Sequence, residues 1–254
     1  MKTINHYLAN SLKVLIISFV CSFAASGASL DVPAKTAIPV VFTHTVDSRK
    51  AKAGDAVTAK TMQIVRLPSG QEIPRNSELI GHVVEVEPVA HNSSPAKLSV
   101  QFESVVVNKQ SFPIRVFVRA MAAPNESYDA MHPTGPVGAD VPETINLIGG
   151  DYTYIEDKHV YGPNDEIVGD RKGEANFARL VGCGERGGSA CCEASSTSQS
   201  VGIYSPSACG LYGFYDVYMT NTGETDRPGI FTLETTRSFV RIYGRSTALL
   251  QVTE

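Results

Sequence analysis

Short segments of alternating apolar and polar residues follow one another through the first half of the chain. The segment 78–87 ends in such an alternation, and residues 97–105 alternate again through Leu98, Val100 and Phe102. A period of two places one set of side chains on one face of a strand, so both segments are predicted to be strands with one buried face. Further strands are predicted at residues 37–45, 56–65 and 111–120.

Turn-forming residues separate these predicted strands. Lys52 to Asp55 and Pro68 to Gly70 are turn sequences, and Asn108-Lys109 predicts a tight hairpin. Gly81 lies inside a predicted strand, where a residue without a side chain favours a bend. Five or six short antiparallel strands are typical of a small closed barrel or a sandwich, and the bend favours the barrel.

The pattern is interrupted between residues 122 and 143, where prolines and glycines leave almost no apolar periodicity. We predict a linker or a long surface loop there. Aromatic and Gly-rich β segments follow, and residues 239–243 and 248–252 are predicted to form a terminal hairpin around Gly244-Arg245. The predicted class is all-β, with a small antiparallel β-barrel followed by a second, disulfide-stapled β domain.

The first 28 residues have the pattern of a secretory signal peptide. Lys2 and Lys13 precede an apolar run at residues 14–23, and small residues follow. A spanning helix needs about 20 apolar residues, so the run favours export with cleavage after Ala28 over a membrane anchor. The expected divisions are a signal peptide at 1–28, a β-barrel-like domain at 29–121, a Pro/Gly-rich linker at 122–143 and a Cys-containing β domain at 144–254.

The remaining chain carries a mild excess of acidic residues. Removal of residues 1–28 takes away two of the 22 basic residues and none of the 26 acidic ones, which lowers the formal net charge from −4 to −6. Such a charge gives no long-range attraction to phosphate backbones, so no nucleic-acid partner is expected. After signal removal no transmembrane helix is expected, and the protein is expected to be periplasmic, outer-membrane-associated or extracellular.

Four cysteines, Cys183, Cys191, Cys192 and Cys209, lie close together in the second half of the chain. In an oxidising compartment such a group indicates disulfides. Three pairings are possible, but adjacent cysteines seldom bond each other because the bridge strains the peptide between them. We expect Cys209 to pair with Cys191 or Cys192. The set has neither a C-x2-C spacing nor accompanying histidines, so disulfides are favoured over a zinc site.

No catalytic constellation is evident in the sequence. A G-x-S-x-G elbow is absent and the histidines are scattered without an H-x-x-x-H pair, so neither a serine hydrolase nor a histidine metal site is predicted. No cofactor is expected. Asp165, Glu166 and Asp170 form an acidic cluster that offers candidate calcium ligands, although a solvated hairpin turn is the favoured interpretation.

Aromatic residues crowd the stretch from residue 204 to residue 218. Tyrosines give contact area at low entropic cost, so the cluster is a candidate ligand surface for a carbohydrate or a peptide. The favoured alternative is the core of a small domain. The residues are Tyr204, Tyr212, Phe214, Tyr215 and Tyr218.

Four strings in the first half share a pattern with a known barrel: I-P-V at 38–40, K-A-G-D at 52–55, I-P-x-x-S-x-L-x-G at 73–81 and V-Q-F-E-S-V at 100–105. Through them, residues 36–120 resemble the C-terminal β-barrel of the conjugation-type scaffold protein of type IV secretion outer-membrane complexes. The resemblance implies a barrel used for assembly in the envelope, with no catalytic residue to carry over. The chain also resembles uncharacterised exported bacterial proteins with the same two-part layout.

These patterns together predict an exported envelope or secreted protein that acts by binding or assembly without catalysis. The expected partners are envelope proteins or glycans. The alternative is an extracellular, glycan-directed hydrolase whose acidic catalytic residues meet only in the folded chain. Two carboxylates with shifted pKa values in a deep cleft would distinguish that alternative.

Overall fold

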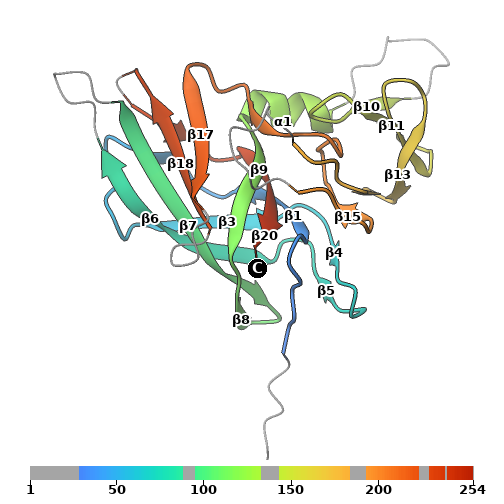
Figure 1. The fold of residues 1–254 in the computed structure, drawn as a ribbon, viewed down its shortest axis with the longest axis horizontal. Coiled ribbons are helices and arrows are strands. Elements are labelled where there is room, and N and C mark those ends of the chain that lie inside the picture. Colours follow the sequence, from blue (N-terminus) through green and yellow to red (C-terminus); the bar gives the residue numbers. More distant parts are fainter. Residues whose placement is uncertain are drawn as a thin grey trace, which may run out of the picture.

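The computed structural model describes residues 29–87, 95–132, 143–183, 193–222, 229–237 and 239–253. Within these residues, ten strands form one sheet that curls into a nearly closed barrel (Figure 1). The strands are β1 (Ala37–Phe42), β3 (Ala56–Thr61), β6 (Glu78–Glu87), β7 (Ala96–Val107), β8 (Gln110–Pro113), β9 (Val116–Ala122), β16 (Gly210–Tyr212), β17 (Val217–Thr222), β18 (Ile230–Thr235) and β20 (Thr247–Val252). The predicted all-β class and the barrel are confirmed.

The barrel interior is filled by the apolar half of each alternating strand. Phe102 lies between Phe42 and Phe231, with ring centroids 5.9 and 6.5 Å away. All three rings are almost inaccessible to solvent, and Leu79 and Leu98 are fully buried beside them in the same core cluster. Burial of such side chains is the main favourable contribution to folding, so the alternation read from the sequence specifies which face of each strand points inward.

The side chain of Asn221 bridges β17 and β9, two strands of the barrel that do not pair through their backbones. The sheet runs in the order β16-β9-β20-β1-β3-β6-β7-β18-β17, so β17 ends the sheet near β9. Asn221 on β17 donates from Nδ2 to the Val118 carbonyl at 2.9 Å, and its Oδ1 accepts from the Val118 amide at 3.0 Å. The carboxamide thus satisfies both backbone groups of Val118, as a neighbouring strand would.

Gly81 marks a bend in the barrel wall, as its sequence position predicted. The pairing of β6 with β7 shifts register between Ile80 and Gly81. A Cβ atom at Gly81 would lie 2.1 Å from the Gln101 carbonyl oxygen. The two strands therefore approach each other more closely here than any residue with a side chain permits.

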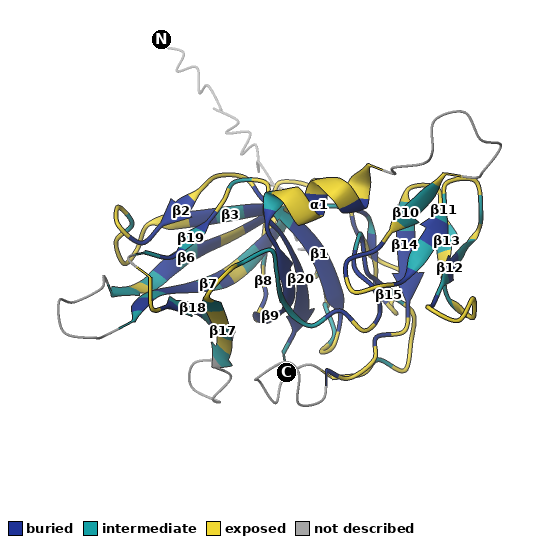
Figure 2. Cartoon of the chain, turned by 90° about the horizontal axis from the view of Figure 1, so that it is seen from above, coloured by how far each residue is buried: buried dark blue, intermediate teal, exposed yellow. Residues whose placement is uncertain are grey.

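A second sheet stands beside the barrel, and helix α1 (Pro124–Met131) runs along the top of the barrel (Figures 1 and 2). This sheet follows chain order through β10 (Thr144–Asn146), β11 (Tyr152–Tyr154), β12 (His159–Tyr161), β13 (Ile167–Lys172), β14 (Ala175–Ala178) and β15 (Gln199–Ser200). Two small ribbons complete the described strands: β2 (Val46–Asp47) with β19 (Arg241–Ile242), and β4 (Val65–Arg66) with β5 (Glu72–Ile73).

The predicted linker at 122–143 begins with a helix, which corrects the sequence interpretation. Pro124 occupies the first turn of α1, a position where its missing N–H costs nothing, and Glu126 in the same turn suits the helix dipole. Ser127 is buried against the barrel and its hydroxyl bonds that of Thr247 at 2.9 Å. Two turns are too short to produce a recognisable period in the sequence. Residues 133–142 lie outside the described residues.

The domain boundary expected after residue 143 does not separate two independent sheets, because strands from both sides of it belong to the barrel. The segment 144–254 is shared between the second sheet and the barrel, because β16, β17, β18 and β20 all belong to the barrel. The terminal hairpin was also a wrong prediction. β19 pairs with β2, while β20 lies between β1 and β9. Local patterns identify strands, but the choice of neighbour depends on residues far away in sequence.

A disulfide joins Cys183 to Cys209, with 5.8 Å between the Cα atoms. The expected pairing of Cys209 with Cys191 or Cys192 is therefore wrong; those two residues lie outside the described residues, as do residues 1–28 of the predicted signal peptide. The segments meet because the Val181 amide donates to the Pro206 carbonyl at 3.0 Å, which brings two chain stretches side by side.

The buried side chain of Arg119 connects the two chain segments around Cys183 and Cys209 to strand β9 of the barrel. It lies on β9 and is fully buried. Its guanidinium donates to the carbonyl oxygens of Ala208, Glu193 and Pro206 at 3.2, 3.0 and 3.1 Å, and also to that of Val181. One side chain thus satisfies carbonyl groups from three segments that have no regular structure.

In the part of the chain that the structure describes, no helix has the length and apolarity needed to cross a bilayer.

Candidate binding site

A cleft with a volume of about 540 Å³ lies between the barrel, helix α1 and the second sheet. Besides two alanines, five large apolar side chains line it, all partly exposed to solvent. They come from the turn after β3, the end of α1, β10 and the turn after β15: Met62, Ile64, Met131, Ile145 and Ile203. A concave, mostly apolar wall of this size is typical of small-molecule sites.

Gln63 and Asn176 link the barrel to the second sheet beneath the cleft. The Gln63 Nε2 donates to the Asn176 carbonyl at 2.8 Å, and the Asn176 amide donates to Gln63 Oε1 at 3.0 Å. The Asn176 side chain also donates from Nδ2 to the Gly202 carbonyl at 2.8 Å. Both side chains are buried, so these bonds fix the position of β14 against the barrel.

Two buried polar atoms at this cleft have no hydrogen-bond partner among the described residues. They are Oδ1 of Asn176 and Nε of Arg171. The residues face each other across the β13–β14 pair, so their side chains project from the same face of the sheet. Buried polar groups without a partner carry a free-energy cost, and they are expected to find one in water or in a ligand.

Basic residues outnumber acidic ones around the cleft. Arg75, Arg171 and Lys172 line it, together with a single carboxylate, that of Glu174. Arg75 Nη1 pairs with Glu174 Oε2 at 2.5 Å, whereas Arg171 and Lys172 have no ion-pair partner among the described side chains. Burial lowers the pKa of Arg171, because desolvation disfavours its charged form. The wall therefore carries positive charge that is only partly balanced.

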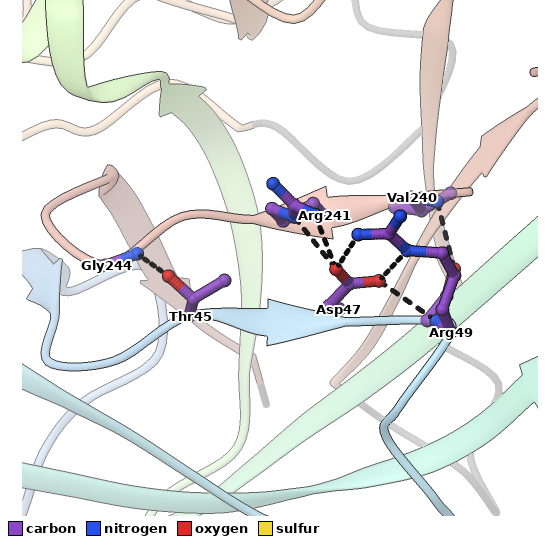
Figure 3. A network of polar contacts seen from close by, with 7 residues as sticks. Thr45, Asp47, Arg49, Val240, Arg241 and Gly244 are labelled. Carbon is purple, nitrogen blue, oxygen red and sulfur yellow. Dashed lines mark hydrogen bonds and ion pairs between the residues drawn. The ribbon is translucent and has the colours of Figure 1, made fainter. Parts of the chain in front are cut away.

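A second cavity, of about 380 Å³, is lined by residues of β2, by Asp55 and by Arg241 of β19. Figure 3 shows the network of ion pairs around Asp47, which also lines this cavity. The buried carboxylate of Asp47 accepts from Nε and Nη2 of Arg49 at 3.0 and 2.6 Å, and from Nη2 of Arg241 at 2.7 Å. The guanidinium of Arg49 lies 4.0 Å from the ring centroid of Phe239. Hydrogen bonds from Arg49, the largest influence, and from Arg241 hold the pKa of Asp47 well below its usual value. The network ties β2 to β19.

We expect Asp47→Asn to lower the free energy of unfolding at pH 7 by about 1–2 kcal/mol, because the variant loses the charge that pairs with Arg241 and with the half-exposed Arg49. The folded-state pKa of Asp47 is depressed, so its contribution is complete above the ordinary pKa of 3.8 and is lost as the pH falls below that value. Urea unfolding at pH 7 and pH 3 should show the difference from the unmodified chain narrowing at the lower pH. Asp55→Asn is the control, since Asp55 is exposed and caps only the Lys52 amide. An equal loss at both pH values would contradict the prediction.

The predicted aromatic surface does not form as a unit. Tyr204 is fully buried and its hydroxyl bonds Thr247 Oγ1 at 2.7 Å, so it belongs to the core. Tyr212 is half-buried and its hydroxyl accepts from the Cys209 amide at 3.2 Å, and Phe214 packs against the barrel core. Tyr215 and Tyr218 are exposed, at 80% and 69%. The five residues therefore lie in different environments: Tyr204, Tyr212 and Phe214 pack into two core clusters, whereas Tyr215 and Tyr218 face solvent.

A different group of aromatic residues gathers on the second sheet. Tyr152, Tyr154 and Tyr161 have ring centroids 5.6 to 5.7 Å apart. The hydroxyl of Tyr152 donates to Asp165, which raises the pKa of Tyr152 to about 12. That of Tyr161 donates to Asp157 at 2.5 Å.

The candidate calcium ligands are engaged separately. Asp165 accepts from Tyr152, Glu166 accepts from the Asn164 amide at 2.9 Å, and Asp170 lies 3.6 Å from the His159 ring nitrogen. Among the described residues, no three His, Cys, Asp or Glu side chains are grouped as metal ligands would be. Asp165 and Glu166 are exposed in the turn between β12 and β13, whereas Asp170 is exposed on β13 itself.

Sequence reasoning missed every residue of the cleft. Arg171 and Asn176 flank Gly173 in what the sequence presents as an ordinary polar hairpin, and Gln63 belongs to a strand end. The one feature of the sequence that could have indicated them is the pair of basic residues Arg171-Lys172 next to a turn, and such pairs are common on protein surfaces. Only the docking of the second sheet on the barrel brings these residues together.

Comparisons with protein-family models, with curated proteins and with solved structures found no match to this chain.

Proposed function

We propose that this chain is an exported binding protein without catalytic activity, and that the cleft between the barrel and the second sheet holds its ligand. The observation that carries the proposal is the lining of the cleft, where partly exposed apolar side chains alternate with cations and buried amides. Such a surface orients a small amphipathic molecule by burying its apolar part and bonding its polar end.

The composition of the two cavities described above disfavours the hydrolase alternative, whereas a third cavity, of about 440 Å³, is lined by two carboxylates, those of Glu126 and Asp129. The larger cleft has one carboxylate, and Arg75 pairs with it. The second cavity has two, Asp47 and Asp55, but Arg49 and Arg241 hold Asp47 ionised, so it is a poor proton donor near neutral pH. We expect the purified chain to show no turnover on a panel of glycans and esters; turnover would overturn the non-catalytic part of the proposal.

Binding in the cleft can be tested with a tryptophan reporter, because the chain contains no tryptophan. Ile145→Trp places an indole at the cleft, where we expect its emission to change saturably on titration with dodecan-1-ol, dodecanoate or dodecylamine. Ile167→Trp is the matched control, since Ile167 is 59% exposed on β13 and does not line the cleft. No change with all three probes, or the same change in the control, would contradict binding at the cleft.

An assembly role is the second candidate, and the barrel supports it at the level of fold alone. The bend at Gly81 falls within the string on which the resemblance to the type IV secretion scaffold barrel rests. Fold likeness transfers poorly to function, so partners have to be identified directly. Crosslinking in the cell envelope followed by pull-down and mass spectrometry should recover secretion-complex subunits at a fixed ratio if the role is assembly.

A further inference from the structure

The charge on the wall of the cleft restricts what it can bind. Among the cations that line it, Arg75 is already paired with Glu174. Neither Arg171 nor Lys172 forms an ion pair among the described side chains; burial lowers the pKa of Arg171, and the charge of Glu174 opposes this with a smaller effect. Both residues adjoin the hairpin turn at Gly173. A cation beside an apolar wall attracts an anion more strongly than one in open water, because the local dielectric constant is lower.

Arg171 differs from an ordinary surface arginine in two ways. Its side chain is half-buried, and its Nε atom is buried without a hydrogen-bond partner. A guanidinium that has lost part of its hydration and lacks one protein acceptor forms strong charge-assisted hydrogen bonds with a carboxylate.

The neighbouring amide adds an independent observation. Asn176 is 3% exposed, lines the same cleft and directly faces Arg171 across the strand pair. Its Nδ2 is committed to Gly202, which orients the side chain, while its Oδ1 is a hydrogen-bond acceptor that has no partner among the described atoms. The polar end of the cleft is therefore fixed in place and offers a donor at Arg171, which suits an anion, beside an acceptor at Asn176, which suits a water molecule or a hydroxyl group.

We propose that the ligand of this cleft is a small amphipathic molecule with an acidic group, whose anion lies against Arg171 and whose apolar part lies along the wall formed by Met62, Ile145 and Ile203. This inference rests on the proposed binding function and adds the chemical class of the ligand. The cleft volume of about 540 Å³ falls in the range of small-molecule sites, of roughly 300–1,000 Å³.

The test compares three probes that share one apolar chain and differ only in the head group: dodecanoate, dodecan-1-ol and dodecylamine. Isothermal titration calorimetry with the purified chain should show dodecanoate binding about tenfold more tightly than dodecan-1-ol, and dodecylamine binding more weakly than either. Added salt should weaken the binding of dodecanoate and leave that of dodecan-1-ol unchanged.

Two variants test whether the preference for dodecanoate over dodecan-1-ol comes from the cations that line the cleft. Arg171→Gln and Lys172→Gln should each weaken dodecanoate binding, Arg171→Gln by about tenfold, with dodecan-1-ol affinity unaltered. Lys60→Gln, which removes an exposed lysine on β3 outside the cleft, is the matched control. Circular dichroism of each variant establishes that it is folded, and Lys172→Gln tests the charge at an exposed position if Arg171→Gln does not fold.

The outcomes separate the two proposals. If dodecan-1-ol binds as tightly as dodecanoate, or if both cleft variants keep full dodecanoate affinity, the inference about the acidic group is wrong while the binding function stands. If none of the three probes binds, both proposals are wrong.

Discussion

Replacement of Arg119 by methionine is expected to lower the free energy of unfolding by about 2–4 kcal/mol. Methionine fills much of the same volume but donates no hydrogen bond, so the carbonyl groups of Val181 and Ala208 lose their donor. The Pro206 and Glu193 carbonyl groups keep a second donor each, the Val181 amide and Gln251 Nε2. Each unsatisfied buried acceptor costs about 1–3 kcal/mol. Urea unfolding followed by circular dichroism measures the loss.

Two further variants make this result specific to the carbonyl contacts. Arg115→Met removes an exposed arginine next to β9 and should change stability by less than about 0.5 kcal/mol. Arg119→Lys keeps the charge but cannot reach several carbonyl groups with one ammonium, so its loss should be intermediate. A loss in Arg119→Met no larger than that in Arg115→Met would show that the contacts do not hold the disulfide segments.

Substitution of Gly81 by alanine is expected to cost more than about 3 kcal/mol, although it adds a single carbon atom. The new Cβ would lie 2.1 Å from the Gln101 oxygen and 2.8 Å from the Phe102 Cα, both of them backbone atoms that move only if β6 and β7 separate. These strands form the longest pairing of the barrel wall, from Glu78–Val106 to Glu87–Lys97. The midpoint of thermal unfolding provides the measurement.

Gly244→Ala is the matched control for this substitution. A Cβ at Gly244 would approach its nearest atoms in His44 no closer than 3.4 Å, which is an ordinary contact. The control should therefore lose less than about 1 kcal/mol. Similar losses in the two variants would mean that the close strand approach at Gly81 is not what limits stability.

The sequence predicts elements well where the cause is local. Residues 78–87 alternate with one buried face and form β6 over the same span, and Asn108 and Lys109 both adopt positive φ in the hairpin between β7 and β8. Asn is among the few residues with a side chain that tolerate this conformation readily. Gly81 likewise signals its bend, because a glycine inside a strand often marks a bulge or a close approach of two backbones.

Contacts between distant segments leave no such signal. The pairing of Cys183 with Cys209 depends on Arg119, whose role as a carbonyl ligand cannot be seen in an alternating strand. The cleft depends on Gln63 and Asn176, which are ordinary polar residues until the two sheets meet. Each of these features is set by tertiary packing, which acts on side chains that the local pattern does not distinguish.

The pairing of β1 with β20 governs when the barrel can form. Ala37 lies opposite Gln251, so strands from the two ends of the described chain are neighbours, and β20 separates β1 from β9. β20 follows every other barrel strand in the chain, and until it has been synthesised β1 and β9 each keep an unpaired edge that can join another chain. Long sequence separation between partners also slows folding. The barrel is therefore expected to close only after β20 has been synthesised, and a fragment that stops at residue 121 should aggregate.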